Sequence, residues 1–275
     1  MMSVRHRLSR LVPRPALERI RAVRQRRSIE GFAPYVTTRS YGGRELRISI
    51  EDPLAQGWYD RDWPRLAEID LLASRGRLGE GARVFDLGAH QCVVALMLAA
   101  EVGGSGTVVA VEATPHNAEV GRRNVALNAA LDAGAVLVCH AVASSEEGTV
   151  AFTPSLNGHV GRTSYAFPTI ELPAVTVDSL ARTYGTPDVV FVDVEGFEQH
   201  VLGGAGRTFG ARPDWFVEVH AGVGLEEQEG SVAGVLAQLE DRGYRLFVGN
   251  SEEGGPYQPL EGPPPPGRFH VVALG

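Results

Sequence analysis

From residue 80 onward, short runs of β-branched and other apolar residues alternate with segments of helical length. This alternation is typical of a parallel sheet that helices cover on both faces. The expected strands are 83–88, 107–112, 135–142, 188–194, 214–219, 244–249 and 268–274, and the expected helices are 91–102, 115–129, 178–184, 196–208 and 230–242. The pattern therefore predicts an α/β fold of the Rossmann-like class, with a seven-stranded, mostly parallel sheet.

Two connections depart from the simple alternation. About 45 residues separate the third and fourth expected strands, and a connection of this length is usually functional or carries structure of its own. The last two strands are joined only by 251–267, which contains four consecutive prolines and has no room for a helix. We therefore expect these two strands to form a C-terminal antiparallel hairpin at the end of the sheet.

The N-terminal part of the chain divides into a basic arm at 1–40 and a cap or lid segment at 41–79, ahead of a main domain at 80–275. Residues 1–27 hold nine arginines and one acidic residue, whereas the rest of the chain is acidic. Charge runs usually mark solvated faces, so a helix lying against the acidic body is the simpler interpretation of the arm. Peripheral contact with a membrane or an anionic carrier is the alternative.

Three aromatic residues, Trp58, Tyr59 and Trp63, follow an alternating strand expected near 44–50 in the cap segment. Aromatic side chains at this place fit either a lid over a substrate or anchors of the core, and the core is the simpler interpretation.

Composition excludes several kinds of chemistry. All 26 basic residues are arginine, so a Schiff-base lysine and a P-loop lysine are excluded. The net charge of −7 and the acidic body argue against a nucleic-acid partner. Cys92 and Cys139 suggest small buried residues rather than a disulfide framework. The sequence has neither an apolar run of membrane-spanning length nor a secretory signal pattern, so we expect a cytoplasmic protein.

The first two strands of the main domain each end in one carboxylate. Asp86 is followed by Gly88 and Ala89, where the backbone can approach a ligand closely. Glu112 lies 24 residues after Gly88, at the end of the next strand, where an acid is placed to accept both hydroxyls of a ribose. This strand–helix–strand unit therefore predicts a nucleoside-binding site.

The turn after the first strand distinguishes between nucleoside cofactors. A dinucleotide fingerprint needs three glycines, but the turn Gly88-Ala89-His90-Gln91-Cys92-Val93 has one. An NAD(P)-dependent oxidoreductase is therefore the less favoured interpretation. The carboxylate of Asp86 instead suits a positively charged amino or sulfonium group, and a sheet that ends in an antiparallel hairpin is the layout of class I methyltransferases.

Several short motifs occur in a fixed order over about residues 80–250. They are Asp86-Leu87-Gly88-Ala89-His90, Val111-Glu112-Ala113-Thr114-Pro115 with Asn117, Asn124 and Asn128, Ala141-Val142-Ala143 with Gly148, Thr176-Val177-Asp178-Ser179-Leu180, Val192-Asp193-Val194-Glu195-Gly196-Phe197-Glu198, Val201-Leu202-Gly203-Gly204-Ala205 and Val217-Glu218-Val219-His220. This set resembles the FkbM family of S-adenosylmethionine-dependent methyltransferases. The resemblance implies methyl transfer to a hydroxyl of a sugar, a glycolipid or a polyketide-like natural product.

The sequence departs from the family pattern in the cofactor turn. The family's turn usually runs Gly-Ala-Asn-x-Gly, and here His90 replaces the asparagine and Cys92 the second glycine. His90 would either hydrogen-bond the carboxylate of the cofactor or narrow the pocket. A non-catalytic module with a degenerate cofactor site therefore stays open as the alternative function.

The resemblance also implies roles for individual residues. Asp86, Gly88, Ala89 and His90 would shape the methionine end of the S-adenosylmethionine site, and Glu112 would bind the ribose. Ala143 begins the segment expected beside the adenine, and Asp193 is expected near the cofactor as well.

Asp193, Glu195 and His220 are the catalytic candidates. The two acids end the fourth strand on one side of it, and His220 ends the neighbouring fifth strand. Methyl transfer to an alcohol needs removal of the hydroxyl proton, and histidine titrates in the useful range, so His220 is our first choice of base. Asp193 is the alternative base, or it orients the substrate.

Other partners follow less directly from the sequence. The same three residues with Glu218 could hold a hard divalent ion, but their spacing is not specific for a metal, and we assign no metal ligand. The acceptor is expected to be a small molecule or a glycan, bound by residues in 36–65 and 153–170. A homodimer is left open.

Overall fold

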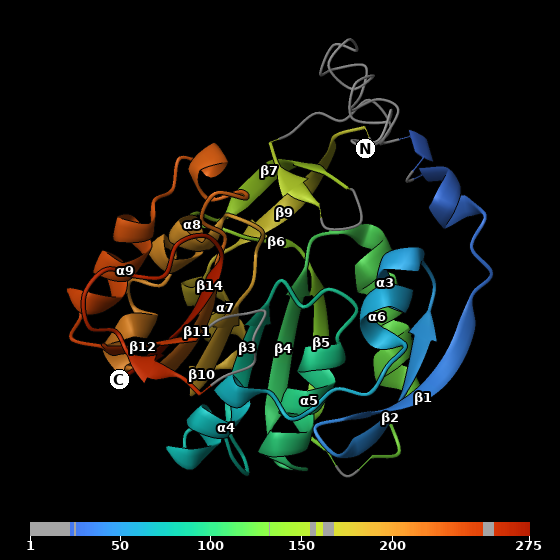
Figure 1. Cartoon of the computed structure of the whole chain (residues 1–275), viewed down its shortest axis with the longest axis horizontal. Helices are drawn as coiled ribbons and strands as arrows, with labels where there is room; N and C mark the ends of the chain where they lie inside the picture. The colour runs from blue at the N-terminus through green and yellow to red at the C-terminus, as the bar shows by residue number, and fades with distance from the viewer. Residues whose placement is uncertain (1–22, 25, 132, 155–157, 162–167, 250–255) are drawn as a thin grey trace, which may run out of the picture.

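The computed structural model describes all residues except 1–22, 25, 132, 155–157, 162–167 and 250–255. Its centre is a sheet of eight strands in the order β13-β12-β14-β11-β10-β3-β4-β5 (Figure 1). The strands are β3 (Arg83–Leu87), β4 (Thr107–Glu112), β5 (Ala135–His140), β10 (Val189–Val192), β11 (Asp214–Val219), β12 (Arg245–Gly249), β13 (Gln258–Pro259) and β14 (Phe269–Leu274). The α/β fold class and the seven expected strands are confirmed. The count of seven was too low, because β13 is too short to give a pattern in the sequence.

The strand directions match the expected layout. β5, β4, β3, β10 and β11 are joined by parallel pairings. β14 runs antiparallel between β11 and β12, so the C-terminal hairpin is confirmed, and β13 pairs with the outer edge of β12.

Both faces of the sheet are covered, as the apolar strands require. Successive residues of a strand point to opposite faces, so Val84 packs into one core and Phe85 into the other. One face carries α4 (Ala67–Ser74), α5 (Val93–Val102) and α6 (Pro115–Leu127), and the other carries α7 (Val177–Tyr184), α8 (Glu198–Gly203), α9 (Val232–Glu240) and the 3₁₀ turn η1 (Thr208–Ala211). Of the described helices, none has the length and apolar character needed to cross a membrane.

The helix expected at 196–208 is shorter than predicted. α8 ends at Gly203, and η1 begins at Thr208 after a turn. Glycine has a poor helix propensity, and the pair Gly203-Gly204 explains this early end.

The long connection after β5 carries structure of its own. It forms a second sheet of four strands in the order β6-β9-β7-β8. These are β6 (Val142–Ala143), β7 (Gly148–Thr153), β8 (His159–Val160) and β9 (Ile170–Val175). Figure 1 shows this small sheet at one end of the large sheet, above β4 and β5.

The N-terminal segment packs against the main domain. β1 (Tyr35–Tyr41) and β2 (Arg44–Ile50) form an antiparallel hairpin, and α3 (Pro53–Tyr59) follows. The hairpin spans the boundary that we expected at residue 40. Ile48 and Ile50 are fully buried in the same core as α5. The expected arm helix falls largely on residues 1–22, outside the described residues.

Asn124 of α6 and Asn128, the residue after this helix, hold the hairpin in place. Asn124 Oδ1 accepts a hydrogen bond from the Ser49 backbone N–H at 2.8 Å. Asn128 accepts from the Arg47 backbone N–H at 3.0 Å and donates to the Arg47 carbonyl at 2.8 Å. The side-chain amides thus pair with the exposed edge of β2 in the way that a neighbouring strand would.

Candidate functional site

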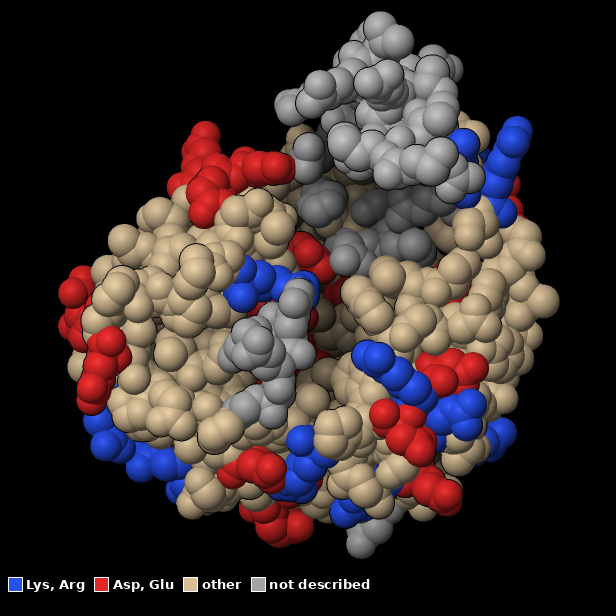
Figure 2. Space-filling model, viewed as in Figure 1, with Lys and Arg blue, Asp and Glu red and all other residues tan. Residues whose placement is uncertain are grey.

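A cavity of about 460 Å³ lies at the carboxyl ends of β3, β4, β10 and β11. The chain leaves β3 toward β4 on one side and returns to its other side as β10, so this is the switch point at which open α/β sheets bind ligands. Figure 2 shows the hollow in this face of the molecule, with acidic side chains visible inside it. Helix α3 and the loop after it, the large sheet and the small sheet all contribute to its lining.

Asp86 and Gly88 form one wall of the cavity. Asp86 is 4% exposed, and its Oδ2 has no hydrogen-bond partner among the described residues. Burial and the nearby charge of Glu112 raise the pKa of Asp86 to about 7. Gly88 has φ +91°, and a Cβ there would overlap the carbonyl oxygen of Asp193. Only glycine therefore fits at this position between the carboxyl ends of β3 and β10.

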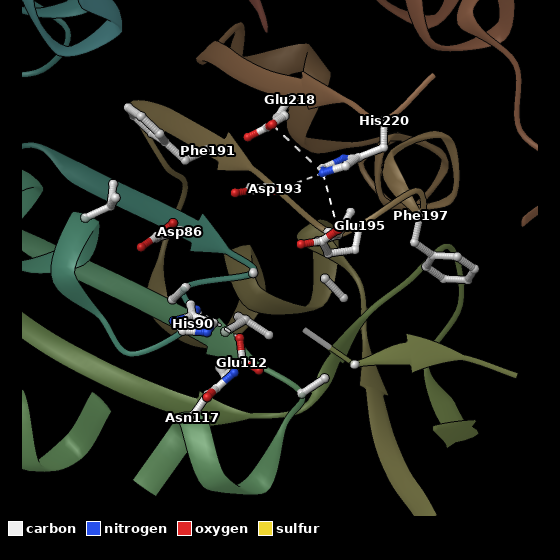
Figure 3. Close-up of a pocket in the computed structure, with 18 of the residues that line it drawn as sticks. Asp86, His90, Glu112, Asn117, Phe191, Asp193, Glu195, Phe197, Glu218 and His220 are labelled. Atoms are coloured by element: carbon white, nitrogen blue, oxygen red, sulfur yellow. Dashed lines mark hydrogen bonds and ion pairs between the residues drawn. The ribbon is translucent and has the colours of Figure 1, made fainter. Parts of the chain in front are cut away.

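Glu112 is held rigidly at the end of β4. Its Oε2 accepts a hydrogen bond from the His90 N–H at 2.9 Å, and its Oε1 accepts from the Thr114 N–H at 2.6 Å. The side chain of Asn117 also hydrogen-bonds this carboxylate. Burial raises the pKa of Glu112 to about 7 despite these hydrogen bonds. Figure 3 shows Glu112 beside His90 and Asn117 in the cavity.

The two unusual residues of the cofactor turn both have left-handed backbones. His90 has φ 47° and Cys92 has φ 63°. Asparagine and glycine adopt this conformation at little cost, whereas other residues are strained in it. The His90 ring lies against Trp58 and Tyr59, and its Nδ1 is 2.8 Å from the Tyr59 hydroxyl. His90 thus joins the wall of the cavity to α3.

The three catalytic candidates meet on the opposite side of the cavity, as Figure 3 shows. His220 Nε2 lies 3.7 Å from an Asp193 oxygen and 3.5 Å from a Glu195 oxygen. Glu218, at the end of β11, approaches the same nitrogen at 4.0 Å. His220 itself is 2% exposed.

Charges around His220 determine the protonation of this group. Burial by itself would lower the pKa of His220, but the hydrogen bond and charge of Glu198 and the charges of Asp193 and Glu195 raise it to about 9. Burial, followed by the charge of Glu218, raises the pKa of Asp193 well above its usual value. Burial raises the pKa of Glu195 as well.

The pKa of Glu218 shifts in the opposite direction to that of Asp193. Burial would raise the pKa of Glu218, but a hydrogen bond from His270 and the charges of His270, His220 and Arg268 lower it. Ligand atoms of Asp193, Glu218 and His220 lie within 4.8 Å of one another, a spacing that an ion could use. The same groups can also take up and release a proton.

A sequence model described as the methyltransferase FkbM domain matches residues 86–246, which is more than half of the chain. The chain belongs to the FkbM methyltransferase family. Its cofactor is S-adenosylmethionine, and the NAD(P)-dependent alternative is excluded.

Among the solved structures to which the chain is similar is an FkbM methyltransferase from Methylobacillus flagellatus, with 13% identity and a TM-score of 0.46 over 70% of this chain and 43% of that one. An S-adenosylmethionine-dependent O-methyltransferase from Thermotoga maritima has 14% identity and a TM-score of 0.44 over 87% and 77%. Fibrillarin from Aeropyrum pernix, solved with bound S-adenosylmethionine, has 14% identity and a TM-score of 0.44 over 90% and 86%. A search of curated proteins found no match.

Glu198 is a buried acid beside the site of this FkbM chain, and the sequence assigned it no role. Glu198, in the first turn of α8, is fully buried, and its Oε1 lies 2.8 Å from His220 Nδ1, within hydrogen-bond distance. The same oxygen accepts the Gly196 N–H at 2.8 Å. An acid in the first turn of a helix is usually explained by the helix dipole, so the sequence offers no signal for this contact beyond the motif itself.

A second connection that the sequence did not reveal joins the cap to the cofactor turn. Asp52 caps α3 through the N–H groups of Leu54 and Ala55, and its other oxygen accepts a hydrogen bond from Gln91 Nε2 at 2.7 Å. Asp52 is fully buried. The turn that carries His90 is therefore fixed from the N-terminal side as well as from β3.

The remaining predicted residues also line the cavity. Ala89 and Ala143 are buried in its wall, and Ala143 belongs to β6 of the small sheet. Trp58, Tyr59 and Trp63 pack in or against the core, as the simpler interpretation expects, and they also line the cavity, where a lid over a substrate stays a prediction. Within the expected acceptor range 153–170, Gly158 and Val160 line the cavity, while 155–157 and 162–167 lie outside the described residues.

Proposed function

We propose that this FkbM protein transfers a methyl group from S-adenosylmethionine to a hydroxyl oxygen of a neutral, polyhydroxylated acceptor such as a sugar, a glycolipid or a polyketide-like natural product. The observation that carries the proposal is that one cavity holds two separate sets of side chains. Asp86 and Glu112 suit the cofactor, and His220 with its acids suits a hydroxyl that must lose a proton.

The side chains on the cofactor side fit S-adenosylmethionine. The unpartnered oxygen of Asp86 is buried, and burying a carboxylate without a partner is unfavourable unless a ligand supplies a cation or a donor. The carboxylate of Glu112, at the end of β4, suits the two hydroxyls of a ribose. When bound, S-adenosylmethionine supplies an electrophilic methyl group on a positively charged sulfur.

His220 would act as the general base. Its Nε2 faces the cavity and, when neutral, can take the proton of an acceptor hydroxyl as the oxygen–carbon bond forms and the carbon–sulfur bond breaks. Asp193 and Glu195 can accept hydrogen bonds from the hydroxyl and its neighbour and so orient the acceptor. The step needs no covalent intermediate on the protein.

The charge of the cavity supports a neutral acceptor. Asp193, Glu195 and Glu218 line it beside His220 and disfavour an anionic acceptor there, although Arg61 and Arg268 are also among the lining residues. Arg268 does not offset this charge freely, because its Nε lies 3.2 Å from Glu218. The indoles of Trp58 and Trp63 add apolar surface of the kind that carbohydrate rings pack against.

The test is methyl transfer from S-adenosylmethionine labelled with ¹³C in its methyl group to a panel of hydroxylated acceptors. The carbon chemical shift of the product tells whether the label is bound to oxygen, nitrogen or carbon. We expect an oxygen-bound label, and a loss of about 100-fold or more in rate for His220→Gln. His200→Gln is the matched control, since His200 stacks on Phe197 behind the cavity lining. A label on nitrogen or carbon, or full activity of His220→Gln, would contradict the proposal.

A further inference from the structure

Glu198 lies behind His220, on the side away from the acceptor. Its carboxylate is fully buried, and an ionised carboxylate that is removed from water costs several kcal/mol unless hydrogen bonds compensate for it. The compensation comes through Oε1, which accepts from His220 Nδ1 and from the Gly196 N–H, each at 2.8 Å. Oε2 has no hydrogen-bond partner among the described residues. The position of this carboxylate is thus defined by His220 and one backbone group.

The backbone around Gly196 fixes the position of Glu198. Gly196 has φ 103°, and a Cβ there would overlap the backbone of Gly224. Glu195, immediately before it, is also left-handed, with φ 52°. This sharp turn directs the Glu195 side chain into the cavity and places Glu198 behind the imidazole of His220. Acidic side chains therefore lie beside both nitrogens of the imidazole.

Without Glu198, the acids of the cavity would favour the tautomer of neutral His220 that cannot act as a base toward the acceptor. A neutral imidazole carries one proton, and Asp193, Glu195 and Glu218 all lie within 4.0 Å of Nε2. These three carboxylates would favour the proton on Nε2, which leaves the lone pair on Nδ1, facing the protein interior. A base for the acceptor hydroxyl needs the reverse arrangement.

We propose that Glu198 is the positioning residue of the methyl-transfer site, because its carboxylate keeps the proton of neutral His220 on Nδ1 and so leaves the lone pair of Nε2 facing the acceptor. The proposal rests on the proposed function, in which His220 is the base. It assigns Glu198 no contact with either substrate.

A merely structural role for Glu198 predicts different behaviour. If Glu198 only tied down the turn through Gly196, its replacement would change stability and leave the titration and tautomer of His220 unaltered. The groups that face His220 are Glu198 from α8, Asp193 and Glu195 after β10, and Glu218 from β11, with Arg268 and His270 behind Glu218. Removing the Glu198 charge from this set lowers the affinity of His220 for a proton.

The variant Glu198→Gln separates these roles. The amide oxygen of glutamine can still accept from Gly196 and from Nδ1, so the fold is retained while the charge is lost. Glu226→Gln is the matched control, because Glu226 also accepts a backbone N–H, from Gly222 at 2.8 Å, but forms no hydrogen bond or ion pair with a histidine among the described residues.

The experiment is ¹⁵N NMR of the full chain with labelled histidine, recorded against pH, with His220→Gln used to assign the signal. We expect neutral His220 to carry its proton on Nδ1 in the wild-type chain. We expect Glu198→Gln to lower the pKa of His220 by more than about one unit and to increase the share of the Nε2–H form. In assays, kcat should fall about 10- to 100-fold with a pH profile displaced toward acid, while KM for S-adenosylmethionine stays within about twofold.

Two results would overturn this inference. One is a wild-type spectrum in which neutral His220 carries its proton on Nε2, and this can be read even if Glu198→Gln does not fold. The other is a folded Glu198→Gln chain whose His220 tautomer and pKa match those of Glu226→Gln. Because the NMR readout needs no acceptor, failure of O-methyl transfer with the expected tautomer would count against the proposed function alone.

Discussion

The thiol of Cys92 occupies the space that a side chain at residue 121 would need. Cys92 precedes α5 at one of the two positions where the cofactor turn departs from the family pattern, and Gly121 lies in the middle of α6. A Cβ added to Gly121 would be 2.6 Å from Cys92 Sγ. The extra volume of the cysteine is therefore matched by the absence of a side chain on the neighbouring helix.

This relationship predicts that the effect of Gly121→Ala on stability changes sign when Cys92 is replaced by glycine. Gly121→Ala should destabilise the chain by about 1–2 kcal/mol, since the overlap with Sγ outweighs the gain in helix propensity. In a Cys92→Gly background the overlap disappears, and Gly121→Ala should stabilise by up to about 1 kcal/mol. Denaturant unfolding of the four chains measures the coupling. Additive effects of the two substitutions would show that the thiol and residue 121 do not compete for space.

Asp86→Asn should stabilise the protein and remove its function. A carboxyl whose pKa is raised by folding binds protons more tightly in the folded state, so stability falls as pH rises from its usual value of 3.8 toward about 7. At pH 8 the asparagine chain should be more stable than the wild-type chain by about 2 kcal/mol, and the gain should shrink at pH 5. Thermal melts of both ligand-free chains at the two pH values check this. A gain that does not depend on pH would rule out the buried charge as its cause.

Binding of S-adenosylmethionine should strengthen as pH rises through about 7 and then level off. Asp86 and Glu112 both have pKa values raised to about 7, and a cationic ligand prefers their ionised forms. Binding near pH 6.5 should therefore release protons. Calorimetry in two buffers with different ionisation enthalpies measures that release. Equal heats in both buffers would mean that neither carboxyl changes its protonation.

The large sheet and the cofactor carboxylates followed from the sequence because they depend on local signals. The apolar runs mark the strands, and Asp86 and Glu112 stand where those runs end. β13 could not be predicted, since two exposed residues carry no apolar pattern. The length of α8 was overestimated because the pattern continued past two glycines.

The contacts that complete the site are not local, and for that reason the sequence did not reveal them. Glu198 meets His220 across 22 residues, and Asp52 meets Gln91 across 39. No periodicity connects such pairs. The same holds for Asn124, whose amide pairs with the backbone of β2, although the resemblance had singled it out. A motif indicates that a residue matters, but only the packing shows what it contacts.

The rate of methyl transfer should increase with pH through the neutral range and level off near or below pH 9. The base must be neutral, and Glu198, Asp193 and Glu195 raise the pKa of His220 to about 9. A bound sulfonium adds positive charge to the cavity, and this charge moves the midpoint toward lower pH. The measurement is kcat/KM for the acceptor from pH 6 to 10 at saturating S-adenosylmethionine. A rate that falls over this range would exclude His220 as the base.

Calorimetric titration of S-adenosylmethionine into the purified, cofactor-free chain tests the central claim most directly. The account predicts saturable binding that weakens by about 100-fold in Glu112→Ala, because two hydrogen bonds to a charged carboxylate are lost. Glu119→Ala is the control, since Glu119 is an exposed carboxylate of α6 whose ion pairs involve only Arg122 and Arg123 among the described residues. It should bind as the wild-type chain does. Absence of binding by a folded wild-type chain at millimolar ligand, or equal binding by Glu112→Ala, would contradict the account and favour a degenerate cofactor site.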